Sequence, residues 1–318
     1  FPNTTAAIFD TDLDGLADQW EEGCGSGCQS GSGLTLDNLP NDTDNDGITN
    51  DIDDDDNNDG VIDVDANSNG LIDIASWEEL NAIRYRLDSA GQKITTEAEL
   101  DTSGCPPIVV DGLLEKRCQG YELIVDLDFD TNGDGVLDSS DTYWNDGEGW
   151  QPIGSGYVSP FTGVFYGNGH VIRNLTIARP DTDNQGLFGY LSYATIKEVG
   201  LSGPLTSITG RHSVGGIAGY ARNSQVTATY VSGSIAGTGS GVGGLLGSAY
   251  YSQLTACYAT GTVSGSDYIG GILGNGDPKT RVIASVSSAY VSGSSSVGGL
   301  VGIWGKATTS YWAKDASG

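Results

Sequence analysis

The sequence predicts a mainly β protein: a parallel β-solenoid, preceded by a small α+β capping segment and by an irregular calcium-bound N-terminal repeat region. Three observations lead to this prediction. The second half repeats a glycine-rich pattern, the first half contains acidic loops with a regularly placed glycine, and one amphipathic segment lies between them. We therefore expect three parts, at residues 1–73, 74–150 and 151–318.

The glycine-rich pattern of the second half has a nearly constant period. Its repeats start at Val214, Val242, Ile269 and Val297, which are spaced by 28, 27 and 28 residues. Short runs of Val, Ile, Thr and Tyr between glycines suit strands that turn corners, and repetition stacks equivalent strands. We expect one coil per repeat, with apolar residues in inward ladders and with the paired glycine of each repeat at a corner that has no room for a Cβ.

These repeats resemble the GLUG motif. The segments VGGIAGYARNSQVTATYVSG and VGGLLGSAYYSQLTACYATG follow the motif's pattern GGLVG…NSYATGTVSG, and FTGVFYGNGHVIRNLTI (161–177) resembles the segment that begins such arrays. The resemblance covers residues 151–318. It implies a secreted bacterial repeat protein whose second half is a β-solenoid.

The two halves of the chain differ in charge. Residues 1–150 hold 36 acids and 5 bases, whereas residues 151–318 hold 6 acids and 9 bases. Such an acidic half argues against nucleic acid or an anionic membrane as a partner and favours bound cations or solubility. No apolar run is long enough to span a bilayer, so we expect no membrane insertion. Because the chain has no Met, we expect that a leader has been removed and that the protein is secreted, extracellular or at the cell surface.

Five segments of the acidic half match the calcium loop of an EF-hand. That loop carries oxygen ligands at positions 1, 3, 5, 9 and 12, a backbone carbonyl at 7 and glycine at 6. We expect calcium as the cofactor, and the apolar residue at position 7 is expected to pack inward while its carbonyl meets the metal. The expected ligands are Asp10, Asp12, Asp14, Leu16, Asp18, Glu21, Asp42, Asp44, Asp46, Ile48, Asn50, Asp53, Asp55, Asn57, Asp59, Val61, Asp63, Asp65, Asn67, Asn69, Leu71, Asp73, Asp130, Asn132, Asp134, Val136, Asp138 and Asp141.

Residues 10–73 are similar to thrombospondin type 3 repeats, in which short DxDxDG segments wrap calcium with almost no other core. The resemblance implies that metal binding supplies folding free energy to this segment. The third and fourth loops depart from the pattern, because Ala66 and Ser76 stand at their twelfth positions. The alternative for all five loops is a solvated acidic surface.

Five cysteines lie at positions 24, 28, 105, 118 and 257. Cys24 with Cys28, and Cys105 with Cys118, suggest two short disulfide loops formed in an oxidising compartment, although all five could be free. Cys257 is left over. We expect a buried free thiol in the slot that Thr229 and Ala289 fill in neighbouring coils.

A helix and a strand are expected in the middle segment. Ser76 and Glu79 form a capping box, and Trp77, Leu80, Ile83 and Leu87 fall on one face, which predicts a helix over 76–89. This helix could cover the first coil of the solenoid or belong to a small independent α+β domain. The run GYELIVDLDFD (120–130) alternates apolar residues and predicts one strand.

Four tyrosines recur near the repeat ends, at 230, 258, 290 and 311. They suggest a structural aromatic ladder, with a sugar-stacking platform as the alternative. The chain contains neither HExxH nor GxSxG. A β-solenoid enzyme with paired carboxylates would depend on Asp181 and Asp183, the two acids of residues 151–318 that lie close in sequence.

We therefore expect no enzyme. The sequence favours a calcium-stabilised structural protein of the cell surface that acts as an adhesin or stalk segment or as the subunit of a self-assembling filament. Its expected partners are further copies of itself, other surface proteins or glycans, and not nucleic acid. The alternative is a β-solenoid protein that binds or cleaves carbohydrate.

Overall fold

The computed structural model describes residues 69–86 and 120–313, and it describes four further strands at 7–8, 19–20, 107–110 and 113–116; side chains are described at 69–84 and 120–313. The chain divides into two compact units, 1–73 with 98–119 and 74–97 with 120–318. In the first unit two antiparallel pairs form, β1 (Ala7–Ile8) with β2 (Gln19–Trp20) and β4 (Pro107–Val110) with β5 (Leu113–Lys116).

The second unit contains a parallel β-solenoid made of four sheets. Sheet 1 contains β6 (Gly120–Leu123), β8 (Val164–Tyr166), β12 (Thr195–Lys197), β17 (Gln225–Thr227), β21 (Gln253–Thr255), β25 (Arg281–Ile283) and β30 (Lys306–Thr308). Sheet 2 contains β7 (Leu127–Asp128), β9 (Val171–Arg173), β10 (Thr176–Ala178), β13 (Gly200–Ser202), β14 (Ser207–Gly210), β18 (Tyr230–Gly237), β22 (Tyr258–Ser264), β26 (Val286–Ser287), β27 (Tyr290–Ser292) and β31 (Tyr311–Trp312). Sheet 3 contains β11 (Phe188–Ser192), β16 (Ala218–Arg222), β20 (Leu246–Tyr250), β24 (Leu273–Asn275) and β29 (Val301–Ile303). Sheet 4 contains β15 (Val214–Gly215), β19 (Ser240–Gly243), β23 (Asp267–Gly270) and β28 (Ser295–Gly298).

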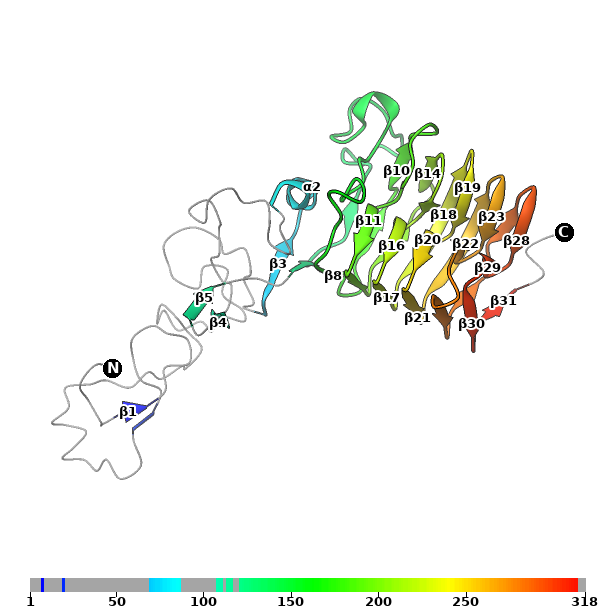
Figure 1. Ribbon diagram of the computed structural model, residues 1–318. Helices are drawn as coiled ribbons and strands as arrows, with labels where there is room; N and C mark the ends of the chain where they lie inside the picture. The colour runs from blue at the N-terminus through cyan, green and yellow to red at the C-terminus, as the bar shows by residue number, and fades with distance from the viewer. Residues whose placement is uncertain are drawn as a thin grey trace. The chain divides into compact units, whose positions relative to one another are not determined.

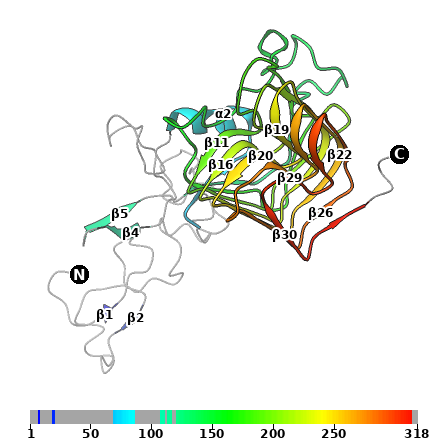
Figure 2. The same cartoon turned by 45° about the vertical axis from the view of Figure 1, so that its right-hand side comes forward.

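Each repeat forms one coil that passes through the sheets in the order 4, 3, 1 and 2. The coil that starts at Val214 contributes β15, β16, β17 and β18, and the next coil contributes β19, β20, β21 and β22. Figures 1 and 2 show these strands side by side, in colours that run from green to red along the solenoid axis. The predicted parallel β-solenoid is thus confirmed.

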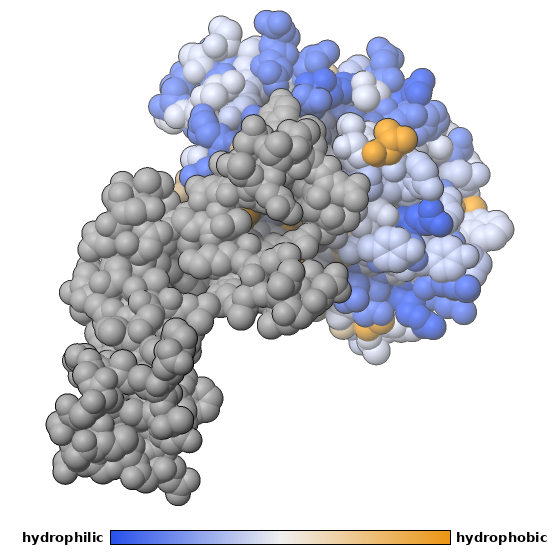
Figure 3. Space-filling model, turned by 60° about the vertical axis from the view of Figure 1, so that its left-hand side comes forward, coloured by the Kyte–Doolittle hydropathy of each residue, from blue (hydrophilic) through white to orange (hydrophobic). Residues whose placement is uncertain are grey.

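The interior is a set of apolar ladders. In β8, β12, β17, β21 and β25 of sheet 1 the middle residue points inward, and each of these residues lies in register with the next. These buried residues are Phe165, Ile196, Val226, Leu254 and Val282. Burying one such side chain contributes about 1.5–3 kcal/mol, so the stack of coils is its own hydrophobic core. The outward positions are mostly polar, and the surface seen in Figure 3 is hydrophilic apart from separate apolar spots.

The paired glycines lie where the coils come closest. Gly243 and Gly270 are in register, and each is followed by the second glycine of its pair. A Cβ on Gly244 would overlap the carbonyl oxygen of Gly271 in the next coil and would lie 2.8 Å from the Cβ of Ala259. The expectation that these positions have no room for a Cβ is confirmed.

Buried hydroxyl groups form a ladder that the sequence did not predict. Ser224 Oγ accepts the N–H of Ala194 at 3.1 Å, and Ser252 Oγ accepts the N–H of Ser224 at 3.1 Å. Each hydroxyl donates to the carbonyl two residues before it, Ser224 to Arg222 at 2.8 Å and Ser252 to Tyr250 at 2.9 Å. The ladder satisfies backbone N–H groups at a buried corner, where an unpaired group would cost about 1–3 kcal/mol.

Cys257 occupies the same kind of position in a neighbouring corner. It is free and buried, as expected, and its N–H donates to Ser285 Oγ at 3.1 Å. Burial raises the pKa of its thiol to about 11, so the thiolate that a nucleophile requires is disfavoured. The equivalent residue in the following coil is Ser285 and not Ala289, because the register pairs Tyr258 with Val286.

Helix α2 (Trp77–Arg86) follows β3 (Leu71–Ile74) and packs on the start of the solenoid. Ser76 Oγ accepts the N–H of Glu79, as the capping box predicts, while Glu79 Oε2 accepts the N–H of Ala75. The Trp77 ring lies 5.3 Å from that of Phe129 and 5.2 Å from that of Trp150, with edge-to-face geometry. Leu80 and Ile83 are buried as expected, and Leu87 lies outside the described residues.

The strand expected over 120–130 is wrong as a single element. It forms two short strands, β6 in sheet 1 and β7 in sheet 2, separated by the exposed Ile124 and Val125. The alternation of apolar residues is that of a coil that turns a corner between two sheets. Within the second unit, β6 is the first strand of sheet 1 and β7 is at the end of sheet 2. The solenoid sheets therefore begin before residue 151.

Candidate functional site

Of the five predicted calcium loops, only the loop at 130–141 is described throughout. The ligands predicted in loops 10–21, 42–53 and 55–66, together with Asp65 and Asn67, lie outside the residues whose side chains are described. The same holds for the cysteines at 24, 28, 105 and 118. Asn69, Leu71 and Asp73 of the fourth loop are described, and Asn69 Oδ1 accepts the N–H of Leu71 at 2.9 Å.

The fifth loop is a series of tight turns closed by its own side chains. Asn132 Oδ1 accepts the N–H of Asp134 at 2.9 Å, and Asp134 Oδ1 accepts the N–H of Val136 at 2.8 Å. Gly135 has φ 81°, a backbone conformation that glycine adopts without a steric penalty. Val136 does not pack inward as expected: 55% of it is exposed.

The two ends of the loop are held by buried carboxylates. Asp130 accepts the N–H of Gly133 at 2.9 Å and that of Gly135 at 2.8 Å. Asp141, only 3% exposed, accepts the N–H of Thr131 at 2.8 Å through Oδ1 and that of Asp138 at 3.0 Å through Oδ2. Positions 1 and 12 of the pattern therefore fix the shape of the loop.

The donor set of this loop fits a hard cation in chemistry, because every predicted ligand supplies oxygen. The positions of these oxygen atoms, however, do not form a closed metal site. Within residues 69–84 and 120–313, no three His, Cys, Asp or Glu side chains come together as a metal site. The loop carboxylates instead accept backbone N–H groups, and hydrogen bonds from Ser140 hold the pKa of Asp138 below its usual value. The calcium ligands of this loop stay a prediction.

Replacing Asp141 by Ala is expected to destabilise the second unit by about 1–3 kcal/mol even without calcium, because two loop N–H groups lose their acceptor. Asp134→Ala is the matched control: Asp134 is exposed, and its loss is expected to cost less than about 1 kcal/mol. Urea denaturation in EDTA measures both. Equal losses of stability would show that the buried carboxylate has no special role in closing the loop.

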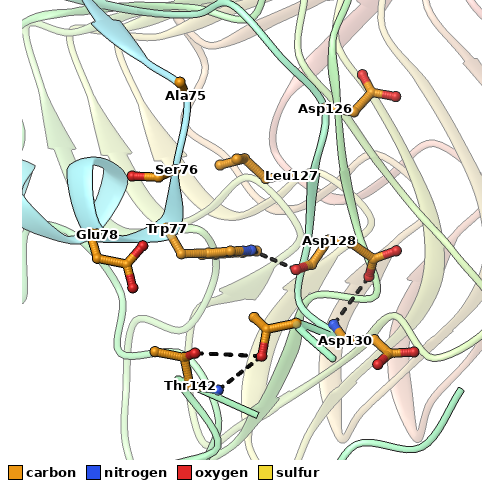
Figure 4. Close-up of a pocket in the computed structure, with 10 residues that line it drawn as sticks. Ala75, Ser76, Trp77, Glu78, Asp126, Leu127, Asp128, Asp130 and Thr142 are labelled. Atoms are coloured by element: carbon orange, nitrogen blue, oxygen red, sulfur yellow. Dashed lines mark hydrogen bonds between the residues drawn. The ribbon is translucent and has the colours of Figure 1, made fainter. Parts of the chain in front are cut away.

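A pocket of about 310 Å³ lies beside this loop, between α2 and the first coil (Figure 4). Asp126, Asp128 and Asp130 line it together with Trp77, whose Nε1 donates to the Asp128 carbonyl at 2.6 Å. Asp128 Oδ1 accepts the N–H of Asp130 at 3.1 Å and the amide of Asn174 at 2.8 Å. Asp128 thus connects α2, through its carbonyl oxygen, to the next coil of the solenoid, through its carboxylate. Sequence reasoning missed this role, although the alternation in VDLDFD was visible.

Asp126 is held by groups of the neighbouring strand β9. It accepts the N–H of Val171 at 2.9 Å and pairs with Arg173 at 2.7 Å and His170 at 3.3 Å. The N–H of Val171, followed by these side chains, keeps the pKa of Asp126 low. An acid held ionised in this way is suited to anchoring two coils and not to donating a proton.

The groups considered for catalysis make structural contacts. Asp183 forms a bidentate pair with Arg211 at 2.7 and 3.0 Å, and Arg211 lowers the pKa of this carboxylate. His212 Nδ1 lies 3.1 Å from Ser240 Oγ but also accepts the Ser240 N–H at 3.0 Å, while Asp183 contacts the backbone N–H of His212. In a catalytic triad the acid would instead orient the imidazole ring.

The predicted tyrosine ladder is wrong beyond its first pair. Tyr230 and Tyr258 are in register, but Tyr290 pairs with Thr262 and Tyr311 with Val286. The segment YVSG occurs at 230–233 and at 290–293, but strand register places the two segments at different positions of the coil. A different ladder forms on sheet 3: Tyr190 stacks on Tyr220 at 4.5 Å and Tyr220 stacks on Tyr250 at 5.4 Å. Burial raises the pKa of Tyr220 to about 12.

The class of protein is a parallel β-solenoid whose repeats from Val214 to Val297 start every 27–28 residues. The family model described as "The GLUG motif" matches residues 238–264. One coil of the solenoid thus matches the GLUG motif. Within the described residues, no helix has the length and apolar character required to cross a membrane.

The chain is similar to two known proteins. The chain is 34% identical over 130 residues to "Halomucin" of Haloquadratum walsbyi, a match that covers 40% of this chain and 1% of that protein. It is similar in structure to a "putative immunoglobulin A1 protease" of Bacteroides ovatus, with 20% identity, a TM-score of 0.45 and coverage of 76% of this chain and 74% of that one. A likeness this distant carries no argument about activity.

Proposed function

We propose that the chain is a non-enzymatic structural segment of an extracellular or cell-surface protein, a rigid solenoid that acts as a stalk or adhesin segment or as a filament subunit. The observation that carries this proposal is the unbroken inward ladder from Phe165 to Val282, in which each coil covers the next. A stack of this kind suits a protein that spaces or supports other groups. The GLUG repeats and the similarity to halomucin are compatible with this role.

Calcium stabilisation of the acidic half is part of the proposal. The 36 acids of residues 1–150 face only 5 bases, so their carboxylates repel one another unless cations neutralise them. The five loop patterns supply oxygen ligands at the spacing that calcium requires. Metal binding would then be folding free energy for this half, as the resemblance of residues 10–73 to thrombospondin type 3 repeats implies.

The last described coil supports self-association. Val214, Val242 and Ile269 are fully buried in sheet 4, but Val297, their equivalent in β28, is 46% exposed. Tyr311 and Trp312 of β31 are exposed as well. These exposed apolar side chains are the candidate contacts between copies.

Electron microscopy of the purified chain in calcium and in EDTA tests this proposal. Filaments or ordered oligomers in calcium, lost when Val297 and Tyr311 are replaced by Lys, are the expected result. Monomers under all conditions, together with cleavage of a polysaccharide, would favour the enzymatic alternative. Replacing Val158, an exposed residue outside the last coil, by Lys controls for a general effect of added charge.

A further inference from the structure

The outward face of sheet 1 has an unusual composition. In β12, β17, β21, β25 and β30 the first and third residues point outward, on either side of the inward residue. Strand register places these residues in two rows along the solenoid axis. The first row is Thr195, Gln225, Gln253, Arg281 and Lys306, and the second row is Lys197, Thr227, Thr255, Ile283 and Thr308. We name these ten residues the basic face.

The basic face carries positive charge without a compensating acid. None of its ten residues is a carboxylate, although the whole chain has a net charge of −28. The salt bridges of the described part involve His170, Arg173, Arg179 and Arg211, and none involves a residue of the basic face. Lys197 Nζ lies 4.7 Å from the centre of the Tyr166 ring, whereas no described ion pair or ring contact engages Arg281 or Lys306. These two cations are therefore available to an external anion.

Two of these cations stand directly side by side. Arg281 and Lys306 are register partners on adjacent strands, and both are exposed. Like charges opposite one another on neighbouring strands destabilise a sheet. An anionic ligand that contacts both side chains would remove this repulsion, so the pair is better explained by binding than by folding.

The carboxylates that border the basic face are engaged by other groups. Glu122 continues the row of Lys197 through Tyr166, but it is buried and accepts a hydrogen bond from the Asn168 amide at 2.6 Å. Glu198 follows Lys197 at the far end of the face, and the Tyr166 hydroxyl hydrogen-bonds to it. Asp277 lies in the turn before β25 and accepts the N–H of Tyr251 at 3.1 Å and the Thr280 hydroxyl at 2.6 Å. Neither Glu198 nor Asp277 bonds to Arg281 or Lys306 among the described contacts.

Exposed aromatic rings border the basic face. Tyr193, Tyr251 and Trp304 occupy equivalent turns between sheets 3 and 1, and they are 72%, 53% and 65% exposed. Their φ angles are 55°, 55° and 71°, in the left-handed region. The corresponding turn of the coil between Tyr193 and Tyr251 has Asn223 in this conformation, with φ 50°. Keeping bulky aromatic residues in a strained and solvated position points to a role for their rings. Lys279 Nζ lies 4.7 Å from the centre of the Tyr251 ring.

We propose that the basic face and its bordering aromatic residues bind an acidic polysaccharide. Arg281 and Lys306 would contact carboxylate or sulfate groups, Gln225 and Gln253 would hydrogen-bond to sugar hydroxyls, and Tyr251 and Trp304 would stack on sugar rings. The Tyr190, Tyr220 and Tyr250 ladder is less suited to this, because its rings cover one another's faces. The inference goes beyond the structural role and requires neither calcium nor assembly.

Affinity electrophoresis of the full chain in gels that contain polygalacturonate tests this inference, with dextran as the neutral probe. Polygalacturonate is expected to retard the chain, more weakly as salt rises, and dextran is expected to have little effect. The double variant Arg281→Gln/Lys306→Gln is expected to weaken the affinity by about 2- to 30-fold, the range for two exposed ion pairs. Trp304→Ala should weaken it in its own right.

Arg222→Gln is the matched control, because Arg222 is an exposed cation on sheet 3, outside the basic face. It should bind polygalacturonate as the unaltered chain does, and circular dichroism confirms that each variant is folded. The inference is wrong if polygalacturonate does not bind, if Arg222→Gln loses as much affinity as the double variant, or if single-stranded poly(dT) binds as tightly as polygalacturonate. The electron microscopy result is independent of each of these outcomes.

Discussion

Treatment with EDTA is expected to abolish the protease resistance of residues 10–73 and to leave the solenoid at 151–313 intact. Four of the five proposed calcium loops fall in the first segment, where Asp53 to Asp56 form an uninterrupted run of acids. Without a cation such carboxylates repel one another, so the loops would open. The solenoid is expected to resist because its stability comes from buried apolar ladders.

Limited proteolysis followed by mass mapping of the fragments measures this effect. Restoring calcium should restore protection, whereas magnesium at the same concentration should do so poorly, because it requires a more rigid octahedral site. Digestion at equal rates with and without chelator would contradict calcium stabilisation. Loss of the solenoid fragments in EDTA would show that the metal acts on the second unit as well.

Replacing Gly244 by Ala is expected to lower the stability of the solenoid by about 1–3 kcal/mol or more, since the added methyl group overlaps the Gly271 carbonyl and the coils must separate. In a unit of this size the change corresponds to a decrease of about 2–12 °C in Tm. Calorimetry measures the shift. Gly156→Ala is the matched control, because a Cβ there meets no atom within 4 Å. A similar decrease in both variants would argue against close packing of the coils.

The solenoid could be predicted because its cause is local and repeated. The spacing of 27–28 residues predicts the length of the coils that start between Val214 and Val297. Val214, Val242 and Ile269 occupy equivalent positions in register, as expected. The helix could be predicted from its cap at Ser76 and its apolar face. Each of these signals arises from residues that are close in sequence or repeat at a constant spacing.

Features that depend on contacts between coils could not be predicted. The hydroxyl of Ser252 is buried because it accepts a hydrogen bond from the N–H of Ser224 in the preceding coil. The sequence around Ser252 does not indicate that this polar side chain is buried. Tyr258 and Tyr290 share a similar sequence context, but only strand register shows that they are not equivalent. The like-charge pair Arg281 and Lys306 is 25 residues apart and is likewise visible only in the register.

The ligand spacing of the candidate calcium loop is a sequence prediction, and the internal hydrogen bonds of the loop could not be predicted. The alternation of Asp130, Asn132 and Asp134 is a sequence property, whereas the burial of Asp141 depends on how the loop closes. The expected inward packing of Val136 failed because position 136 faces solvent and no apolar surface covers it. Ligand spacing alone does not determine which side of a loop is covered.

The central claim is that the repeats stack as parallel coils in register, and disulfide trapping tests it most directly. Gln225 and Gln253 are register partners with exposed side chains, so cysteines at both positions would have Cα atoms about 4.8 Å apart, within reach of a disulfide. Cysteines at 225 and 281 would be two coils apart, at about 10 Å, which is too far. Under mild oxidation, peptide mapping should find the 225–253 bond in the monomer and no 225–281 bond. Absence of the first bond, or formation of both with equal ease, would contradict the stacked solenoid.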